Sequence, residues 1–222
     1  MEPPPATPRI VHVVDDDVNL LRAVDRLLRS HGYTVKTYSA ASEFLSIGIP
    51  AGPACLLLDL NMPEMTGLEL QQVISDYQSR LSIVFISGQG DIPATVRAMK
   101  AGAVDFLTKP FEGDVLVAAI DTALSRSHAA HASDDELQKD WELFQSLSGR
   151  ERQVCLLFSQ GMLNKQIAAE LGTAERTIKA QRGSVMRKLG ADSASDVVRL
   201  IQRLRDADRL PSIGTPKTMP SR

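Results

Sequence analysis

Carboxylates directly follow two short apolar runs in the first half of the chain. Three consecutive aspartates at 15–17 follow Ile10–Val14, and Asp59 follows Ala54–Leu58. Clustered carboxylates repel one another unless a cation joins them, and their hard oxygen atoms suit Mg²⁺. A carboxylate can also act as a nucleophile and accept a phosphoryl group as an acyl phosphate. The spacing therefore points to metal-assisted phosphoryl chemistry.

Two further side chains fit the same chemistry. Ser87 follows a third apolar run and Lys109 a fourth. Phosphoryl transfer depends on positioning and charge neutralisation, which require a metal together with hydroxyl or cationic donors. In the site that these residues suggest, Asp59 attacks the phosphorus while Asp15 and Asp16 hold the metal. Ser87 and Lys109 bind the oxygens of the product.

These side chains meet only if the apolar runs are strands of one sheet. Five short apolar or β-branched segments alternate with segments of helical spacing, which predicts an α/β fold with a five-stranded parallel sheet and helices on both faces. Functional groups of such sheets collect beyond the carboxyl ends of the strands. The predicted strands are Ile10–Val14, Thr34–Tyr38, Ala54–Leu58, Ile83–Ile86 and Val104–Leu107, and the predicted helices lie near 18–30, 40–47, 66–79, 92–101 and 112–127.

The motifs of this half resemble the receiver domain of bacterial two-component response regulators. The resemblance covers about residues 9–127 and rests on Val-Asp-Asp at 14–16, Leu-Asp-Leu-Asn-Met-Pro at 58–63 with Gly67, Ser-Gly at 87–88 and Lys-Pro-Phe at 109–111. It implies a flavodoxin-like fold in which Asp59 accepts a phosphoryl group from the phosphohistidine of a sensor histidine kinase. By the same resemblance, Mg²⁺ is bound by Asp15, Asp16, Asp59 and the main-chain carbonyl of Asn61, Ser87 and Lys109 contact the phosphoryl group, and the Lys109–Pro110 bond is cis.

Several residues of this half have a simpler structural explanation. Phe106 stands where the resemblance places an aromatic switch residue, but a strand phenylalanine can equally be part of the core. Because it lacks a hydroxyl group, Phe106 would switch by packing alone. Asp17 by itself is typical of a helix cap. The four histidines are expected to be packing or surface residues, since His128 and His131 have no cysteine partners for a metal site.

The second half of the chain is predicted to be helical. Ser148 and Glu151 have capping-box spacing and begin a helix that runs to about Gln160. Further helices are expected over 165–171, over 174–189 and from Ser193 onward, and glycines close the first three. Four short helices with glycine stops fit a compact DNA-binding bundle.

The third of these helices is basic. Its buried stripe is predicted to contain Ile178, Val185, Met186 and Leu189, which leaves Lys179, Arg182 and their neighbours on an exposed face. A helix fits the major groove of DNA, arginine or lysine can pair with guanine edges, and basic side chains displace counterions from phosphates. A merely solvated basic face is the alternative, but the short preceding helix and the glycine turn favour DNA binding.

This half resembles the LuxR-type helix-turn-helix over about residues 147–205. The matching motifs are Leu-Ser-Gly-Arg-Glu-Arg at 147–152, Asn-Lys-Gln-Ile-Ala at 164–168, Arg-Thr-Ile-Lys at 176–179 and Met-Arg-Lys-Leu at 186–189. Together the halves resemble the FixJ/NarL group of response regulators. The resemblance implies that 175–189 is the recognition helix, with Lys179, Ala180, Arg182 and Gly183 facing bases, Lys165, Thr177 and Lys188 touching phosphates, and Arg176 in the same DNA-binding set.

Some residues depart from the commoner LuxR-type pattern, and these departures bear on which DNA sequence the domain recognises. Gly149 stands where proline is usual and Gln181 where histidine is usual. Gly183 lies in the middle of the predicted helix, where glycine costs about 1 kcal/mol relative to alanine. These positions leave the promoter sequence open.

The net charge of −2 conceals two oppositely charged halves. Residues 1–127 contain 10 Lys and Arg against 15 Asp and Glu, a net charge of −5, whereas residues 149–205 contain 11 against 5, a net charge of +6. The sequence thus predicts a receiver domain over 9–127, a linker over 128–146 that is partly helical, and an all-α four-helix DNA-binding domain over 147–205. A flexible N-terminus over 1–8 and a disordered tail over 206–222 complete the prediction.

Composition indicates a cytoplasmic protein without a membrane partner. The longest apolar stretches are far shorter than the roughly 18 residues of a membrane helix, and the N-terminus has neither the basic start nor the apolar run of a secretory signal. Cys55 and Cys155 lie in different apolar segments and are expected to pack as small hydrophobic residues.

The combined prediction is a phosphorylation-controlled transcription factor that binds promoter DNA and forms a homodimer on phosphorylation. One alternative is a phosphatase of the haloacid-dehalogenase type, which needs a second aspartate where Asn61 stands. Another is a receiver joined to a protein- or RNA-binding module, which the basic recognition helix disfavours. Small-molecule sensing, as in quorum-sensing relatives, is disfavoured because the first half carries receiver motifs.

Overall fold

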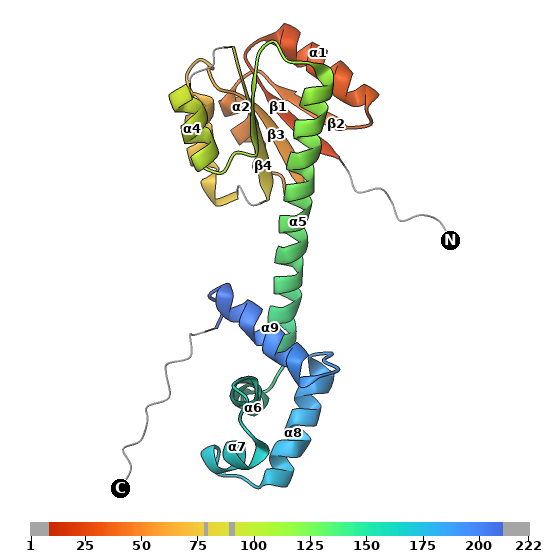
Figure 1. The fold of residues 1–222 in the computed structure, drawn as a ribbon, viewed down its shortest axis with the longest axis vertical. Coiled ribbons are helices and arrows are strands. Elements are labelled where there is room, and N and C mark those ends of the chain that lie inside the picture. Colours follow the sequence, from red (N-terminus) through yellow and green to blue (C-terminus); the bar gives the residue numbers. More distant parts are fainter. Residues whose placement is uncertain (1–8, 78–79, 89–91, 211–222) are drawn as a thin grey trace, which may run out of the picture. The chain divides into compact units, whose positions relative to one another are not determined.

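The chain forms two compact units, with the boundary between Ser133 and Asp134. The structure, a computed structural model shown in Figure 1, describes residues 9–77, 80–88 and 92–210. The segments 1–8 and 211–222, for which flexibility and disorder are predicted, lie outside the described residues, as do residues 78–79 of the third predicted helix.

The first unit contains a five-stranded parallel sheet, as predicted. Its strand order is β2-β1-β3-β4-β5, and β3 and β4 are buried along their whole length, as expected for a parallel sheet covered on both faces. The strands are β1 (Ile10–Val14), β2 (Thr34–Tyr38), β3 (Ala54–Asp59), β4 (Leu81–Ser87) and β5 (Asp105–Thr108).

Helices cover both faces of this sheet (Figure 1). One hydrophobic core lies under α1 and α5 and contains Leu28 and Leu116. The other lies under α2, α3 and α4 and contains Phe44, Leu70 and Ala98. The helices are α1 (Val18–Ser30), α2 (Ala41–Ser46), α3 (Gly67–Val73), the 3₁₀ turn η1 (Ser75–Tyr77), α4 (Ile92–Lys100) and α5 (Gly113–Gln145).

The largest departure from the sequence prediction is α5, which continues through almost all of the predicted linker. Its last turns belong to the second unit, where Phe144 is buried and Leu137 and Trp141 pack against the core. These three residues are spaced i, i+4 and i+7 and therefore share one helical face. The surrounding His, Ala, Ser and acidic residues hide this stripe in the sequence.

The second unit otherwise consists of four helices close to the predicted ones. They are α6 (Gly149–Ser159), α7 (Asn164–Glu170), α8 (Glu175–Lys188) and α9 (Ala194–Asp206). Capping boxes at Ser148–Glu151 and Ser193–Asp196 begin α6 and α9. Leu210, inside the predicted tail, is buried in the core of this unit.

Both cysteines are buried and unpaired, as predicted. Across the described parts of the chain, no helix combines the length and the apolar character needed to cross a membrane.

Candidate functional site

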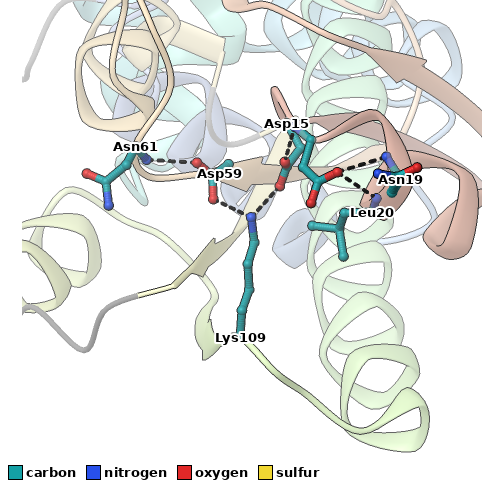
Figure 2. A network of polar contacts seen from close by, with 7 residues as sticks. Asp15, Asn19, Leu20, Asp59, Asn61 and Lys109 are labelled. Carbon is teal, nitrogen blue, oxygen red and sulfur yellow. Dashed lines mark hydrogen bonds and ion pairs between the residues drawn. The ribbon is translucent and has the colours of Figure 1, made fainter.

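Lys109 joins two carboxylates at the carboxyl ends of the strands (Figure 2). Its Nζ donates to Oδ2 of Asp15 at 2.6 Å and to Oδ1 of Asp59 at 2.7 Å. Asp15 follows β1, Asp59 ends β3 and Lys109 follows β5, so the parallel order of the strands brings the three residues together. The Lys109–Pro110 peptide bond is cis, as the resemblance implied.

Asp59 has polar neighbours but is largely shielded from solvent. Its side chain is 6% exposed, and its Oδ2 accepts a hydrogen bond from the main-chain N–H of Asn61 at 2.9 Å. Burial raises the pKa of Asp59, and the neighbouring Asp15 carboxylate adds to this effect, although Lys109 and the Asn61 N–H act in the opposite direction. Burial alone would lower the pKa of Lys109, but its two carboxylate partners outweigh burial and raise it.

The remaining aspartates of the cluster have different roles. Asp16 is exposed and lines a hollow of about 460 Å³ together with Asp15, Asp59, Asn61 and Lys109. Asp17 caps α1, since its Oδ1 accepts from the main-chain N–H groups of residues 19 and 20. The cap interpretation of Asp17 is therefore confirmed.

Ser87 and Phe106 lie on the two strands beside this hollow. Ser87 is fully buried at the end of β4, pairs with Thr108 in the sheet register, and accepts the main-chain N–H of Lys109 at 2.7 Å through its carbonyl oxygen. Phe106 is half-buried, and its ring stacks on Phe85 with the ring centroids 6.2 Å apart.

Gly67 allows α3 to begin against the end of β3 at Asp59. A Cβ atom at this position would collide with the main-chain oxygen of Asp59 and lie 2.9 Å from Cε1 of Phe85. The N–H of Gly67 donates to the carbonyl of Leu60 at 2.9 Å. Only glycine therefore permits this close approach of two main-chain segments.

The second unit contains a helix-turn-helix formed by α7 and α8. Gly172 adopts φ +59°, and the N–H of Thr173 closes the end of α7 on the carbonyl of Ala168 at 2.9 Å. The side of α8 opposite Ile178 and Val185 is exposed and contains Arg176, Lys179, Ala180, Gly183 and Arg187. Lys165 on α7 is also exposed, and Thr177 is half-buried.

Two of the predicted DNA-contacting cations have partners within the unit. Arg182 is half-buried rather than on the exposed face, because it stands four residues after Ile178 and three before Val185 and so shares their side of α8. Lys188 lies 2.7 Å from Oε2 of Glu151, a carboxylate that also accepts from Ser184 Oγ at 2.8 Å.

Sequence reasoning missed the contacts of Glu151, Phe158 and Asn164. Glu151 was expected only as a helix cap, yet it also joins α6 to α8. Asn164 and Phe158 both contact Arg182. A buried glutamate partner could have been sought from the excess of cations on α8, but nothing in the sequence indicates the other two contacts.

Family comparisons agree with this architecture in both units. Residues 11–121 match the response regulator receiver domain, and residues 145–201 match the bacterial regulatory proteins of the luxR family.

Full-length relatives match most of the chain. The response regulator protein TodT of Pseudomonas putida (strain F1) is 42% identical over 198 residues, which cover 89% of this chain and 87% of the relative. The transcriptional regulatory protein FixJ of Rhizobium meliloti (strain 1021) is 38% identical over 190 residues, which cover 86% of this chain and 93% of the relative.

Solved structures give the same result. The response regulator StyR is 44% identical with a TM-score of 0.79, covering 89% of this chain and 100% of that chain. Full-length FixJ from B. japonicum is 38% identical with a TM-score of 0.53, covering 93% of this chain and 100% of that chain. The chain therefore belongs to the two-component response regulators that join a receiver domain to a LuxR-type DNA-binding domain, and it is a phosphorylation-dependent transcription regulator.

Proposed function

We propose that Asp59 accepts the phosphoryl group of a sensor histidine kinase and that the exposed side of α8 binds promoter DNA. The observation that carries the first part is the position of Lys109 Nζ between the carboxylates of Asp15 and Asp59. This arrangement places a cation beside a shielded carboxylate, which is the combination that phosphoryl transfer requires.

In the proposed step, a carboxylate oxygen of Asp59 attacks the phosphorus of the kinase phosphohistidine. The new O–P bond forms as the P–N bond breaks, and the imidazole leaves. Lys109 and the hydroxyl group of Ser87 contact the oxygens of the transferred group. The asparagine at 61 has no acid–base function of its own, so the chain lacks the second aspartate with which a dehalogenase-type phosphatase turns over. The protein is accordingly proposed to be a phosphoacceptor without catalytic turnover.

Mg²⁺ is the proposed cofactor, and the donor set fits it. Asp15, Asp16 and Asp59 line one hollow with Asn61, whose main-chain carbonyl is the fourth proposed ligand, and hard oxygen ligands suit this ion. When bound, Mg²⁺ supplies charge neutralisation for the phosphoryl oxygens. Among residues 9–77, 80–88 and 92–210, no three Asp, Glu, His or Cys side chains are already arranged as a metal-ligating group. Lys109 supplies the positive charge between Asp15 and Asp59 in this structure.

Phosphorylation is proposed to favour a homodimer through the surface of α4 and β5. Ile92, Val96 and Met99 are 74%, 44% and 42% exposed and lie on one side of α4, at spacings of four and three residues. An added phosphoryl dianion that draws Ser87 and Lys109 toward itself would move β5, where Phe106 packs on Phe85. Phe106 is thus proposed to respond to phosphorylation through a change in its packing alone, since it has no hydroxyl group to form a hydrogen bond.

On DNA, Lys179, Ala180 and Gly183 are proposed to face bases. Arg176, Lys165, Thr177 and Lys188 are proposed to contact phosphates, Lys188 after leaving Glu151. Two recognition helices of a dimer would reach paired half-sites. Because the partner is promoter DNA, the proposed compartment is the cytoplasm, and no membrane partner is proposed.

Asp59→Asn provides the test of the phosphoacceptor. The variant should take up no phosphoryl group from the cognate kinase, and footprinting with a phosphoryl donor should give the same DNA protection as without it. Asp76→Asn, an exposed carboxylate on η1, is the matched control and should behave like the unchanged protein. Full phosphoryl uptake by Asp59→Asn would disprove the assignment.

A further inference from the structure

Arg182 lies on the inner side of α8, where it contacts two other helices. Its guanidinium carbon lies 3.7 Å from the ring centroid of Phe158 in α6. Its Nη1 donates to Oδ1 of Asn164, the first residue of α7, at 2.5 Å. Ile178 and Val185, which share this side of α8, are both 0% exposed. Arg182 therefore makes its polar contacts inside the unit.

The chemistry of arginine suits these two contacts together. A guanidinium group is planar, so one face can stack on an aromatic ring while an edge N–H donates a hydrogen bond. Phe158 is 5% exposed, so its ring is fixed by the core of the unit. Asn164 is half-buried and begins the first helix of the helix-turn-helix. One side chain of α8 thus contacts both α6 and α7.

We propose that Arg182 is a positioning residue that sets α8 against α7 and does not itself contact a base. This inference rests on the proposed binding of DNA by α8 and changes the role that the sequence suggested for one of its residues. Lys179 and Gly183 lie on the adjoining, solvent-exposed side of the same helix. A change in the packing of Arg182 would alter the angle at which they approach DNA without removing any group that contacts it.

The test uses the full-length protein and a duplex that the unchanged protein selects from a randomised library in the presence of a small phosphoryl donor. Arg182→Lys retains the charge but cannot both stack and donate along an edge. Asn164→Ala removes the acceptor, Asn164→Asp restores one, and Phe158→Leu removes the aromatic face. Arg199→Lys, at an exposed arginine of α9 outside the proposed DNA-binding surface, is the matched control. All binding is measured at a temperature at which circular dichroism shows every variant to be folded.

A positioning role predicts a shared loss. Arg182→Lys and Asn164→Ala should each weaken binding to the selected duplex about tenfold, which is the size expected for one lost charged hydrogen bond. Their double variant should lose little more than either alone, because both remove the same contact. Asn164→Asp should recover most of the affinity, Phe158→Leu should also weaken binding, and Arg199→Lys should not. The salt dependence of Arg182→Lys should match that of the unchanged protein.

Other results would overturn the proposal in distinct ways. A base contact would appear as a relaxed preference at one base pair in Arg182→Lys, with Asn164→Ala unaffected. Independent, additive losses would show that the two residues do not act together. If these variants have lower melting temperatures but bind the selected duplex with unchanged affinity while they are folded, Arg182 has only a structural role. If the unchanged protein selects no duplex, the proposed DNA-binding function fails first and the inference falls with it.

Discussion

Glu151 combines a helix cap with an ion pair. Its carboxylate accepts the main-chain N–H of Ser148 at 2.8 Å, the hydroxyl of Ser184 at 2.8 Å and the ammonium of Lys188 at 2.7 Å. These partners, with Lys188 first, lower the pKa of Glu151 from its ordinary 4.5 to about 2. A single carboxylate thus joins the start of α6 to the end of α8.

We predict that Glu151→Gln destabilises the protein by about 2 kcal/mol at pH 7, since it removes a charged hydrogen-bond acceptor. A carboxyl group whose pKa is lowered by folding stabilises the folded state above its ordinary pKa, and this stabilisation is lost as pH falls through the lowered value. The difference in unfolding free energy should therefore shrink between about pH 4.5 and pH 2. Urea unfolding across this range measures it.

Glu175→Gln serves as the control because Glu175 is exposed in the first turn of α8. Its effect should be small at every pH. A Glu151→Gln difference that stays constant from pH 7 to pH 3 would show that the carboxylate charge contributes nothing to the fold.

Gly183 is a second residue whose role can be tested by substitution. It lies in the middle of α8, and a Cβ atom there would meet nothing within 4 Å. Gly183→Ala should therefore stabilise the unit by about 1 kcal/mol, because alanine loses less conformational freedom in a helix. If DNA approaches this face closely, the added methyl group should weaken binding to the selected duplex while thermal stability rises.

Gly149→Ala is the matched control, since Gly149 also has open space around its Cβ position and begins α6. It should leave DNA affinity unchanged. Unchanged or tighter binding by Gly183→Ala would show that the DNA backbone and bases do not come close to this position.

At the scale of the elements, local signals in the sequence predicted most of the framework. β1 and β2 begin and end where their apolar and β-branched runs do, and Asp17 starts α1. β3 and β4 extend into Asp59 and Ser87, because parallel pairing continues past the last apolar residue. Functional groups of a parallel sheet collect beyond the carboxyl ends of its strands, and this alone was enough to predict that Lys109 lies beside the aspartates.

What the sequence could not give is the direction of individual side chains. Arg182 was predicted on the exposed face because charge was weighed above the i, i+4, i+7 spacing that it shares with Ile178 and Val185. The packing partner of that arginine, Phe158, lies on a different helix. Likewise, the apolar stripe of α5 near Trp141 is diluted by polar neighbours, so the sequence did not show that part of the predicted linker packs into the core of the second unit.

The last turns of α5 should be required by the second unit. Phe144 and Leu147 are buried in its core, and Asp140 forms an ion pair with Arg203 of α9 at 2.6 Å. A fragment of residues 134–222 should melt well above one of residues 147–222. Loss of the buried Phe144 contacts alone costs about 3–5 kcal/mol. Calorimetry of the two fragments measures the difference.

The fluorescence of the single tryptophan gives an independent measure of how the last turns of α5 pack in the second unit. Trp141 stacks on Phe144 with ring centroids 6.1 Å apart, so its fluorescence should change when the longer fragment unfolds. Asp135→Asn, an exposed carboxylate on the same helix, is the control substitution in that fragment. Equal melting temperatures for the two fragments would show that α5 is a linker after all.

At the scale of the whole molecule, charge separates the two functions. The acidic first half carries the proposed phosphoryl site, and the basic second half carries the cations that are proposed to displace counterions from DNA. The cations of the proposed DNA-binding surface, Arg176, Lys179, Lys165 and Lys188, are all exposed on α7 and α8. If each displaces about one counterion from DNA, a plot of log affinity against log salt concentration has a slope of about −4.

If phosphorylation produces a dimer that engages two half-sites, this slope should become about twice as steep, near −8. Asp59→Asn treated with the same phosphoryl donor should retain the shallower slope, because it cannot form the dianion that favours the dimer. Arg126→Gln, which removes an exposed cation from the first unit, should leave both slopes unchanged. Fluorescence anisotropy on one duplex at several salt concentrations gives all three values. Identical slopes with and without phosphorylation would mean that the switch changes the affinity of each bound protein and not the number of recognition helices on the DNA.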